Sequence, residues 1–282
     1  MRLSDPKTIK EVLTKNGFQF KKSLGQNFLI NPSVCPKMAD NAVANGEEAV
    51  IEIGPGIGVL TAELAKRAKN VVCIEIDERL RPVLSETLAE FDNVEIIFGD
   101  CMKLDIAAII EERFKGKKVS VCANLPYYIT SPIIMMLLES RLPITSVTVM
   151  VQKEAADRIC AKVGSRESGA VTVAVNYYCQ PEVLFNVSRG SFMPPPNVDS
   201  SVIGLNIRPE PPVKLTDEKG FFRFVRSAFG QRRKTLVNSA TSDGRLTKDA
   251  VRKALQEANL PETVRAEALT MDELANVFSA LK

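Results

Sequence analysis

Residues 123–130, ANLPYYIT, place an amide, a proline and two aromatic rings directly after the apolar run KVSVC. A turn alone needs only the Asn and the Pro. The side-chain oxygen of Asn124 and the backbone carbonyl of Leu125 are two hydrogen-bond acceptors, and Pro126 biases Leu125 towards an extended conformation. Two acceptors on one amino group localise its nitrogen lone pair and stabilise the positive charge that develops during attack. Such a pair of acceptors would suit a reaction in which the exocyclic amine of a base is the nucleophile.

The two tyrosines that follow differ in the role that the sequence indicates for each. Tyr127 offers a ring on which a base drawn out of its stack can lie. For Tyr128 the sequence leaves open a similar role, a place in the core, or a place behind the reacting residues. The chain has no histidine, which excludes Ser-His and Cys-His catalysis and histidine-ligated zinc. Amine methylation needs no such base, because the neutral amine attacks first and loses its proton afterwards.

A glycine-rich loop, EIGPGIGVLT, follows the first apolar strand. Gly54 and Gly56 allow the backbone to approach a ligand closely, with a helix N-terminus behind them. The dinucleotide fingerprint requires a third glycine where Val59 stands. The loop instead resembles the E-x-G-x-G-x-G loop of S-adenosylmethionine methyltransferases, although a purely structural turn remains an alternative.

Two acidic residues end the next two predicted strands. Glu75 is placed to accept two hydroxyl hydrogens from a ribose, and Asp100 to accept a hydrogen from the amine of an adenine ring. Asp77 is better interpreted as the N-cap of the following helix. Ligands of open α/β sheets bind outside the carboxyl ends of the strands. The glycine-rich loop, Glu75 and Asp100 follow three consecutive strands, so together they predict one nucleoside site.

The elements that must position these residues alternate. Continuously apolar strands are predicted at 49–54, 70–77, 94–100, 118–126 and 145–152, separated by helices, as in a parallel sheet covered on both faces. A helix at 6–16 precedes them, and a second helix is predicted to open with Asn31 as N-cap. Residues 170–178, 183–188 and 200–208 are predicted to be strands that close the sheet in antiparallel fashion.

A proline-rich linker, RPEPPVKLTD, leads to a wholly helical region, in which Thr270 and Glu273 have capping-box spacing. We therefore expect an α/β fold, a Rossmann-like doubly wound sheet with a small all-helical C-terminal domain. The predicted domains are 1–210, a leader with the catalytic domain, and 211–282, a helical RNA-binding domain.

Composition and charge narrow the class of protein further. The six cysteines are scattered without a C-x-x-C pair, which is typical of a reducing cytoplasm and predicts no metal site. No apolar run reaches the roughly 18 residues of a membrane span. Residues 1–22 hold six basic against two acidic residues, residues 221–253 nine against two, and residues 47–112 six against fifteen. Basic ends around an acidic middle favour a polyanionic partner, with a solvated charged face as the alternative.

Several motifs together carry a resemblance to a known family. NLPY is similar to the rRNA variant of the N/D-P-P-Y/F motif of amino-methyltransferases. With GQNFL (25–29), EIGPGIGVLT, GD (99–100), VQKE (151–154) and SFMPPPNVDSSV (191–202), it resembles the ribosomal RNA adenine dimethyltransferase family. The stretch FGQRRKTLVNS (229–239) is similar to the bacterial small-subunit members, and the motifs occur in family order over nearly the whole chain.

The resemblance implies a class I methyltransferase fold, with S-adenosylmethionine as the methyl donor. It implies N6-dimethylation of two adjacent adenosines in the 3′-terminal hairpin of small-subunit rRNA, within a pre-30S particle, by a cytoplasmic monomer without a membrane partner. The implied cofactor-binding residues are Asn27, Leu29, Gly54, Gly56, Glu75, Asp100 and Asn124. The catalytic set is Asn124, Leu125, Pro126 and Tyr127, with Phe192 on the opposite face of the base unless it is simply core.

Basic residues near the ends of the chain are candidates for phosphate contacts. They are Lys21, Lys22, Arg223, Arg226, Arg232, Arg233 and Lys234. Two alternatives remain open: a large-subunit adenine methyltransferase of the antibiotic-resistance type, and a ribosome-assembly factor that binds RNA without catalysis. A nicotinamide oxidoreductase is disfavoured by Val59 and by the absence of a histidine to relay protons.

Overall fold

The structure is a computed structural model that describes residues 3–18 and 28–281. The chain divides into two compact units, each described by itself below. The sheet unit is Met1–Ala156 with Glu182–Ile207, and the helical unit is Asp157–Pro181 with Arg208–Lys282. The chain therefore passes between the units three times. The helical unit takes in residues 157–181, which the sequence-based division into 1–210 and 211–282 assigns to the catalytic domain.

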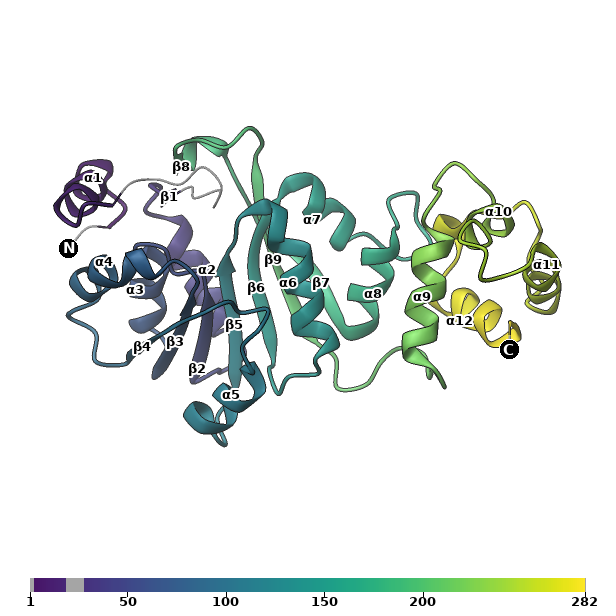
Figure 1. Ribbon diagram of the computed structural model, residues 1–282, viewed down its shortest axis with the longest axis horizontal. Helices are drawn as coiled ribbons and strands as arrows, with labels where there is room; N and C mark the ends of the chain where they lie inside the picture. The colour runs from purple at the N-terminus through teal and green to yellow at the C-terminus, as the bar shows by residue number, and fades with distance from the viewer. Residues whose placement is uncertain (1–2, 19–27, 282) are drawn as a thin grey trace. The chain divides into compact units, whose positions relative to one another are not determined.

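The sheet unit is organised around a seven-stranded sheet in the order β4-β3-β2-β5-β6-β9-β7 (Figure 1). Strands β2 to β6 pair in parallel, and β9 pairs antiparallel with β6, so the predicted antiparallel closure by 200–208 is confirmed. Since β2 lies between β3 and β5, the strand order reverses there, which is where doubly wound sheets bind ligands. The strands are β2 (Ala49–Ile53), β3 (Asn70–Glu75), β4 (Val94–Phe98), β5 (Val119–Asn124), β6 (Ser146–Gln152), β7 (Cys179–Val187) and β9 (Ser200–Ile207).

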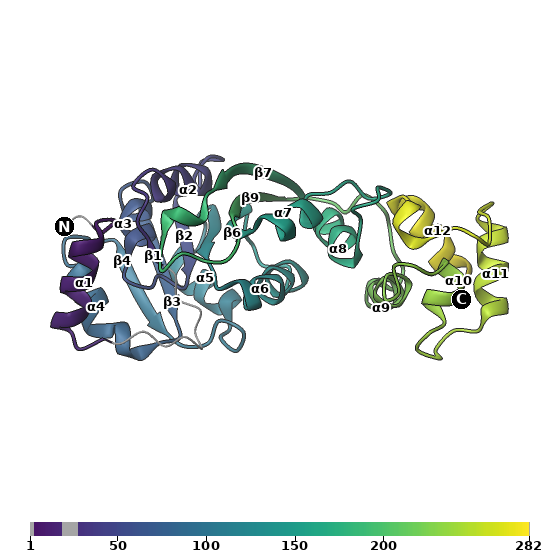
Figure 2. The same ribbon diagram turned by 90° about the horizontal axis from the view of Figure 1, so that it is seen from above.

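Helices cover both faces of this sheet (Figures 1 and 2). The helices that precede the helical unit are α1 (Pro6–Lys15), α2 (Val34–Ala42), α3 (Val59–Ala65), α4 (Arg81–Thr87), α5 (Ile106–Phe114) and α6 (Tyr127–Glu139), with a 3₁₀ turn, η2, at Glu78–Leu80. Helix α7 (Lys153–Ile159) begins in the sheet unit and ends in the helical unit. The predicted N-cap Asn31 is wrong, because α2 begins three residues later and the Asn31 carboxamide oxygen accepts from the Ser33 N–H at 3.1 Å. Throughout the described ranges, no helix is long and apolar enough to cross a lipid bilayer.

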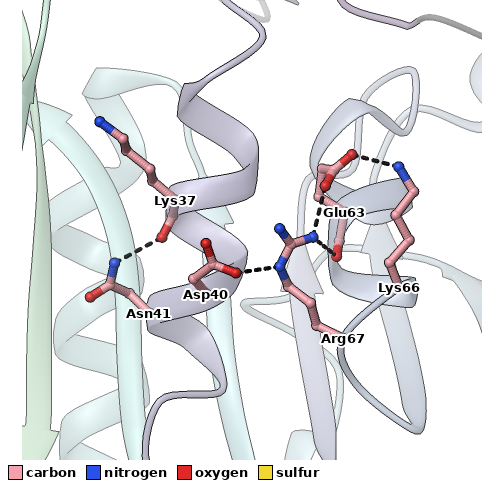
Figure 3. Close-up of polar contacts among 6 residues, drawn as sticks. All are labelled: Lys37, Asp40, Asn41, Glu63, Lys66 and Arg67. Carbon is pink, nitrogen blue, oxygen red and sulfur yellow. Dashed lines mark hydrogen bonds and ion pairs between the residues drawn. The ribbon is translucent and has the colours of Figure 1, made fainter.

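Helices α2 and α3 are tied together near the C-terminal end of α3 (Figure 3). The Arg67 guanidinium donates to the Asp40 carboxylate at 2.5 Å and to the Glu63 carboxylate at 2.7 Å. Beneath these charges, Met38 and Ala39 of α2 and Leu64 of α3 are fully buried in one hydrophobic cluster with strands β2 and β3. The C-terminal half of α3 is therefore held against α2 by packing and by charge.

A two-stranded ribbon adds a second layer near the carboxyl ends of the parallel strands. Strands β1 (Phe28–Leu29) and β8 (Phe192–Met193) pair antiparallel, with Leu29 opposite Phe192. The Ser191 carbonyl, in the 3₁₀ turn η3 (Arg189–Ser191), accepts from the Ile30 N–H at 2.8 Å and extends the ribbon. This ribbon links the described residues that precede α2 to those that precede β9.

The helical unit contains α8 (Ala170–Tyr178), α9 (Glu218–Ala228), α10 (Leu236–Ala240), α11 (Lys248–Glu257), η4 (Ala266–Ala268) and α12 (Met271–Ala280). The predicted capping box of α12 is confirmed, with Thr270 and Glu273 exchanging side-chain and backbone hydrogen bonds.

The strand predicted at 170–178 is wrong, because this segment is helix α8. Its valines favour strands by propensity, but tertiary packing overrides a weak local preference. Glu218 of α9 accepts hydrogen bonds from the hydroxyls of Tyr177, at 3.1 Å, and Tyr178, at 2.6 Å. Both rings also pack on Phe222, with ring centroids 5.3 and 5.5 Å away.

Candidate active site

A cavity of about 420 Å³ lies at the carboxyl ends of β2, β3, β4 and β5. Its walls are mainly apolar, with a few polar groups that converge from four strand ends, which is the usual composition of a small-molecule site. The sequence-predicted residues that line it are Leu29, Gly54, Gly56, Glu75, Asp100, Asn124, Leu125, Pro126, Tyr127 and Phe192. The structure therefore brings together ten of the predicted residues, which come from distant parts of the chain.

The glycine-rich loop forms the floor of this cavity. Gly54 has φ +72° and Gly56 has φ +59°, a conformation that side chains other than glycine rarely adopt. A Cβ atom at Gly56 would lie 3.5 Å from the Phe28 ring, and one at Gly54 would lie 3.8 Å from the Leu125 side chain. Side chains at these positions would narrow the cavity, so the loop fits a ligand that approaches the backbone closely.

Glu75 ends β3 and is almost fully buried, with 4% of its surface exposed. Its two carboxylate oxygens accept from the Gly56 N–H at 3.2 Å and from the Asp77 N–H at 2.8 Å. Burial raises the pKa of Glu75, and these backbone donors oppose that effect. Because each carboxylate oxygen has a second lone pair, the group can still accept hydrogens from a diol.

Asp100 follows β4 on the far side of Glu75. Its carboxylate accepts from the Met102 N–H at 3.0 Å and lies 3.6 Å from the exposed Lys103 ammonium. Asp77 caps the next turn by accepting from the Arg79 N–H at 3.2 Å, which confirms its predicted N-cap role. Three carboxyl groups therefore line the cavity, those of Glu52, Glu75 and Asp100.

The Asn-Leu-Pro-Tyr turn connects β5 to α6. Asn124 is the last residue of β5, and Pro126, with φ −56° and ψ 135°, is the N-cap of α6. In the ranges 3–18 and 28–281, no hydrogen bond engages the Asn124 carboxamide or the Leu125 carbonyl. Both acceptors therefore remain available to a substrate that enters the cavity.

Tyr127 and Phe192 enter the same cavity from different elements. The Tyr127 hydroxyl lies 2.7 Å from the hydroxyl of Ser200, the first residue of β9, and this contact fixes the ring. Burial raises the pKa of Tyr127. Phe192 is 4% exposed and is held in β8 opposite Leu29. Phe192 is thus both a core residue and a lining residue, whereas the sequence alone leaves these two roles as alternatives.

Tyr128 does not lie in the core, because 65% of its surface is exposed. It also lines the cavity, so it stands at the mouth of the site. Of the three roles that the sequence leaves open, the structure excludes only the buried one.

The predicted RNA-binding residues fall in two groups. Lys21 and Lys22, together with the predicted cofactor ligand Asn27, lie outside the described residues. The others are exposed in the helical unit, on α9 and on the turn that follows it: Arg223, Arg226, Arg232, Arg233 and Lys234. Arg232 donates to the Arg166 carbonyl at 2.8 Å and lies 3.9 Å from the Glu267 carboxylate, so its side chain is partly anchored.

Sequence reasoning missed Glu52 and Ser200. Glu52 lines the cavity from the middle of β2 with only 1% of its surface exposed, and the Cys73 thiol lies 3.5 Å from its carboxylate. Burial raises the pKa of Glu52 to about 7. A single acidic residue in the apolar strand AVIEI was the available signal. The signal for Ser200 was absent, because its role depends on a contact with Tyr127 that no spacing predicts.

Three comparisons place the chain among known proteins. A family model described as Ribosomal RNA adenine dimethylase matches residues 17–282. A protein of Geobacillus thermodenitrificans named Ribosomal RNA small subunit methyltransferase A is 50% identical, over 99% of this chain and 97% of its own. A protein of the same name from Clostridioides difficile is 46% identical, over 99% and 97%.

Solved structures agree with this fold. A dimethyladenosine transferase from Plasmodium falciparum has a TM-score of 0.71 at 27% identity, covering 89% of this chain and 95% of its own. The 23S rRNA methyltransferase ErmE has a TM-score of 0.67 at 27% identity, covering 90% and 99%. The predicted Rossmann-like methyltransferase fold is thereby confirmed.

Proposed function

This chain belongs to the ribosomal RNA adenine dimethylase family, and we propose that it transfers methyl groups to N6 of two adjacent adenosines in small-subunit rRNA. It is an rRNA methyltransferase by family, and its relatives at 46–50% identity carry the small-subunit name. The observation that carries the proposal is the convergence of Asn124, the Leu125 carbonyl and Tyr127 on the cavity that Glu75 and Asp100 also line.

The proposed methyl donor is S-adenosylmethionine, which supplies an electrophilic methyl group when bound. Glu75 would accept from its ribose hydroxyls and Asp100 from its adenine amine, while Gly54 and Gly56 let the backbone approach it. Leu29 and Asn124 complete the described part of the proposed cofactor site, and Asn27 is a further proposed ligand outside the described residues. The carboxyl groups of Glu75 and Asp100 in one cavity also suit a cofactor that carries positive charge.

The target adenine would lie between the rings of Tyr127 and Phe192, which return the stacking that the base loses when it leaves the RNA. The Asn124 side-chain oxygen and the Leu125 carbonyl would each accept one hydrogen of the N6 amine. These two acceptors pull the hydrogens out of the plane of the ring, so the nitrogen lone pair becomes localised and nucleophilic. The proton then leaves N6 after methyl transfer, and no general base is required of the protein.

The particular substrate belongs to the same proposal. We take it to be the 3′-terminal hairpin of small-subunit rRNA in a pre-30S particle, acted on by a monomer in the cytoplasm. Exposed basic residues of the helical unit would contact its phosphates and supply affinity without reading sequence. The similarity to small-subunit relatives favours this substrate over large-subunit rRNA, although ErmE shares the fold.

The deciding experiment incubates the protein with labelled S-adenosylmethionine and either unmethylated small subunits or large-subunit rRNA precursors, followed by mapping of the modified nucleotides. We expect two neighbouring N6-dimethyladenosines near the 3′ end of small-subunit rRNA. Label found only in large-subunit rRNA would overturn the proposal. Binding to the small subunit without any transfer would instead identify an assembly factor.

A further inference from the structure

Tyr128 is the most exposed of the large hydrophobic side chains that reach solvent in the described ranges, with 65% of its surface accessible. Helix α6 buries a different face, formed by Thr130, Ile133 and Ile134. Even so, Tyr128 lines the cavity. The ring therefore stands at the boundary between the cavity and solvent, where a macromolecule that delivers its base to the cavity must pass.

The two neighbouring tyrosines are held differently. Tyr127 is half-buried and its hydroxyl is hydrogen-bonded to Ser200. For Tyr128, the described parts of the chain provide no hydrogen bond or ring contact. Its backbone is nonetheless fixed by Pro126 and by the Ile129 N–H, which donates to the Pro126 carbonyl at 3.1 Å. A free ring on a rigid backbone suits contact with an outside partner, because little backbone order is lost on binding.

The position of Tyr128 indicates which partner this is. In the sheet order, β5 lies on the opposite side of β2 from β3 and β4, whose ends carry Glu75 and Asp100. Tyr128 follows β5 in the same turn as Asn124 and Tyr127, whereas the carboxylates proposed to hold the cofactor follow β3 and β4. Since Tyr127 and the Leu125 carbonyl, the proposed contacts to the base, belong to this turn, the partner of Tyr128 that the geometry favours is the substrate strand.

A base that leaves its stack exposes one face of the next base in the strand. That face is a flat apolar surface, and aromatic side chains cover such faces in most single-stranded RNA complexes. We propose that Tyr128 stacks on the nucleobase adjacent to the target adenine, so that the turn grips two consecutive nucleotides. This inference rests on the function proposed above and adds a second base-binding position to it.

The proposal is tested with Tyr128→Ala, Tyr128→Leu and Tyr128→Phe in the full chain. The assay is methyl transfer from S-adenosylmethionine to unmethylated small subunits, with kcat and KM measured separately and cofactor affinity measured by titration calorimetry. Stacking on a base predicts that Tyr128→Ala raises KM for the particle by roughly 10-fold. Tyr128→Phe keeps the ring and should match the unaltered chain, whereas Tyr128→Leu should stay close to Tyr128→Ala. Cofactor affinity should change little, because Tyr128 follows a different strand from Glu75 and Asp100.

A matched control is Val183→Ala, at an exposed apolar position on β7 away from the cavity. Unchanged KM in Tyr128→Ala would overturn the inference, as would equal losses in Tyr128→Phe and Tyr128→Ala, since the hydroxyl would then be the contact. A loss of cofactor affinity would assign Tyr128 to the cofactor site instead. If the unaltered chain methylates no small-subunit rRNA, the proposed function fails first, and the two failures are thus distinguishable.

Discussion

Leu29 and Phe192 lie opposite each other in the antiparallel ladder of β1 and β8, and both side chains line the cavity. The ladder holds Leu29, which precedes α2, against Phe192, which precedes β9. A single pairing thus places one residue of the proposed cofactor site and one of the proposed base site on the same wall. A change of register between β1 and β8 would shift Leu29 relative to Phe192 and disturb this wall.

Asn124→Ala should lower kcat by roughly 100-fold, because it removes one of two acceptors proposed to act on the reacting amine. Cofactor affinity, measured by calorimetry, should fall by only a few-fold, since Gly54, Glu75 and Asp100 remain. Equal losses in turnover and in cofactor binding would contradict the acceptor role.

Ser200→Ala should lower methyl transfer by several-fold, because the Tyr127 hydroxyl loses a partner worth about 1 kcal/mol and the ring becomes mobile. Tyr127→Phe should cause a similar loss, and the double variant should be no worse than either single variant. Ser201→Ala is the matched control, since the Ser201 hydroxyl donates to Asn186 at 2.8 Å. Additive losses in the double variant would show that the hydroxyl pair does not act as a unit.

Glu52→Gln should change how stability depends on pH. Burial raises the pKa of Glu52 from 4.5 to about 7, so the folded protein retains a proton that the unfolded chain loses. The retained proton therefore makes its whole contribution to the free energy of unfolding below pH 4.5. This contribution decreases as the pH rises towards 7. At pH 8 the variant should be more stable than the parent by roughly 1 to 3 kcal/mol, with the difference vanishing near pH 4.5.

The measurement for this prediction is urea unfolding without cofactor at several pH values. Glu95→Gln serves as the control, because Glu95 is an exposed residue paired with Arg113. Parallel stability curves for Glu52→Gln and the parent protein would show that Glu52 does not titrate in this window.

Reversing the charges of Arg232 and Arg233 to Glu should weaken binding to small subunits and flatten its salt dependence by about one unit of slope per lost phosphate contact. Filter binding between about 50 and 200 mM salt measures this slope. Lys115→Glu, an exposed charge reversal in the sheet unit, should leave the slope nearly unchanged. An unaltered slope in the double variant would place both arginines outside the RNA footprint.

Much of the site was predictable because parallel strands bring their carboxyl ends to one edge. That rule alone gathered Gly54, Glu75, Asp100 and Asn124 around one cavity, as expected from the chain order of strands and helices. It depends only on the apolar pattern of each strand and on where that pattern stops.

Other parts depend on contacts between distant segments, which no local pattern contains. The contact of Tyr127 with Ser200 requires β9 to pair with β6, and the helix at 170–178 is stabilised by Glu218 from another segment. The protonation of Glu52 likewise follows from its neighbours in three dimensions, since its strand position alone does not reveal how deeply it is buried.

The dependence of α8 on α9 also bears on how this molecule can be dissected. A gene cut after residue 210 would leave the hydroxyls of Tyr177 and Tyr178 without Glu218 and their rings without Phe222. The liberated C-terminal piece would in turn expose the surface that α8 covers. Chimeras that exchange the C-terminal helical region between relatives should therefore carry residues 157–181 together with it.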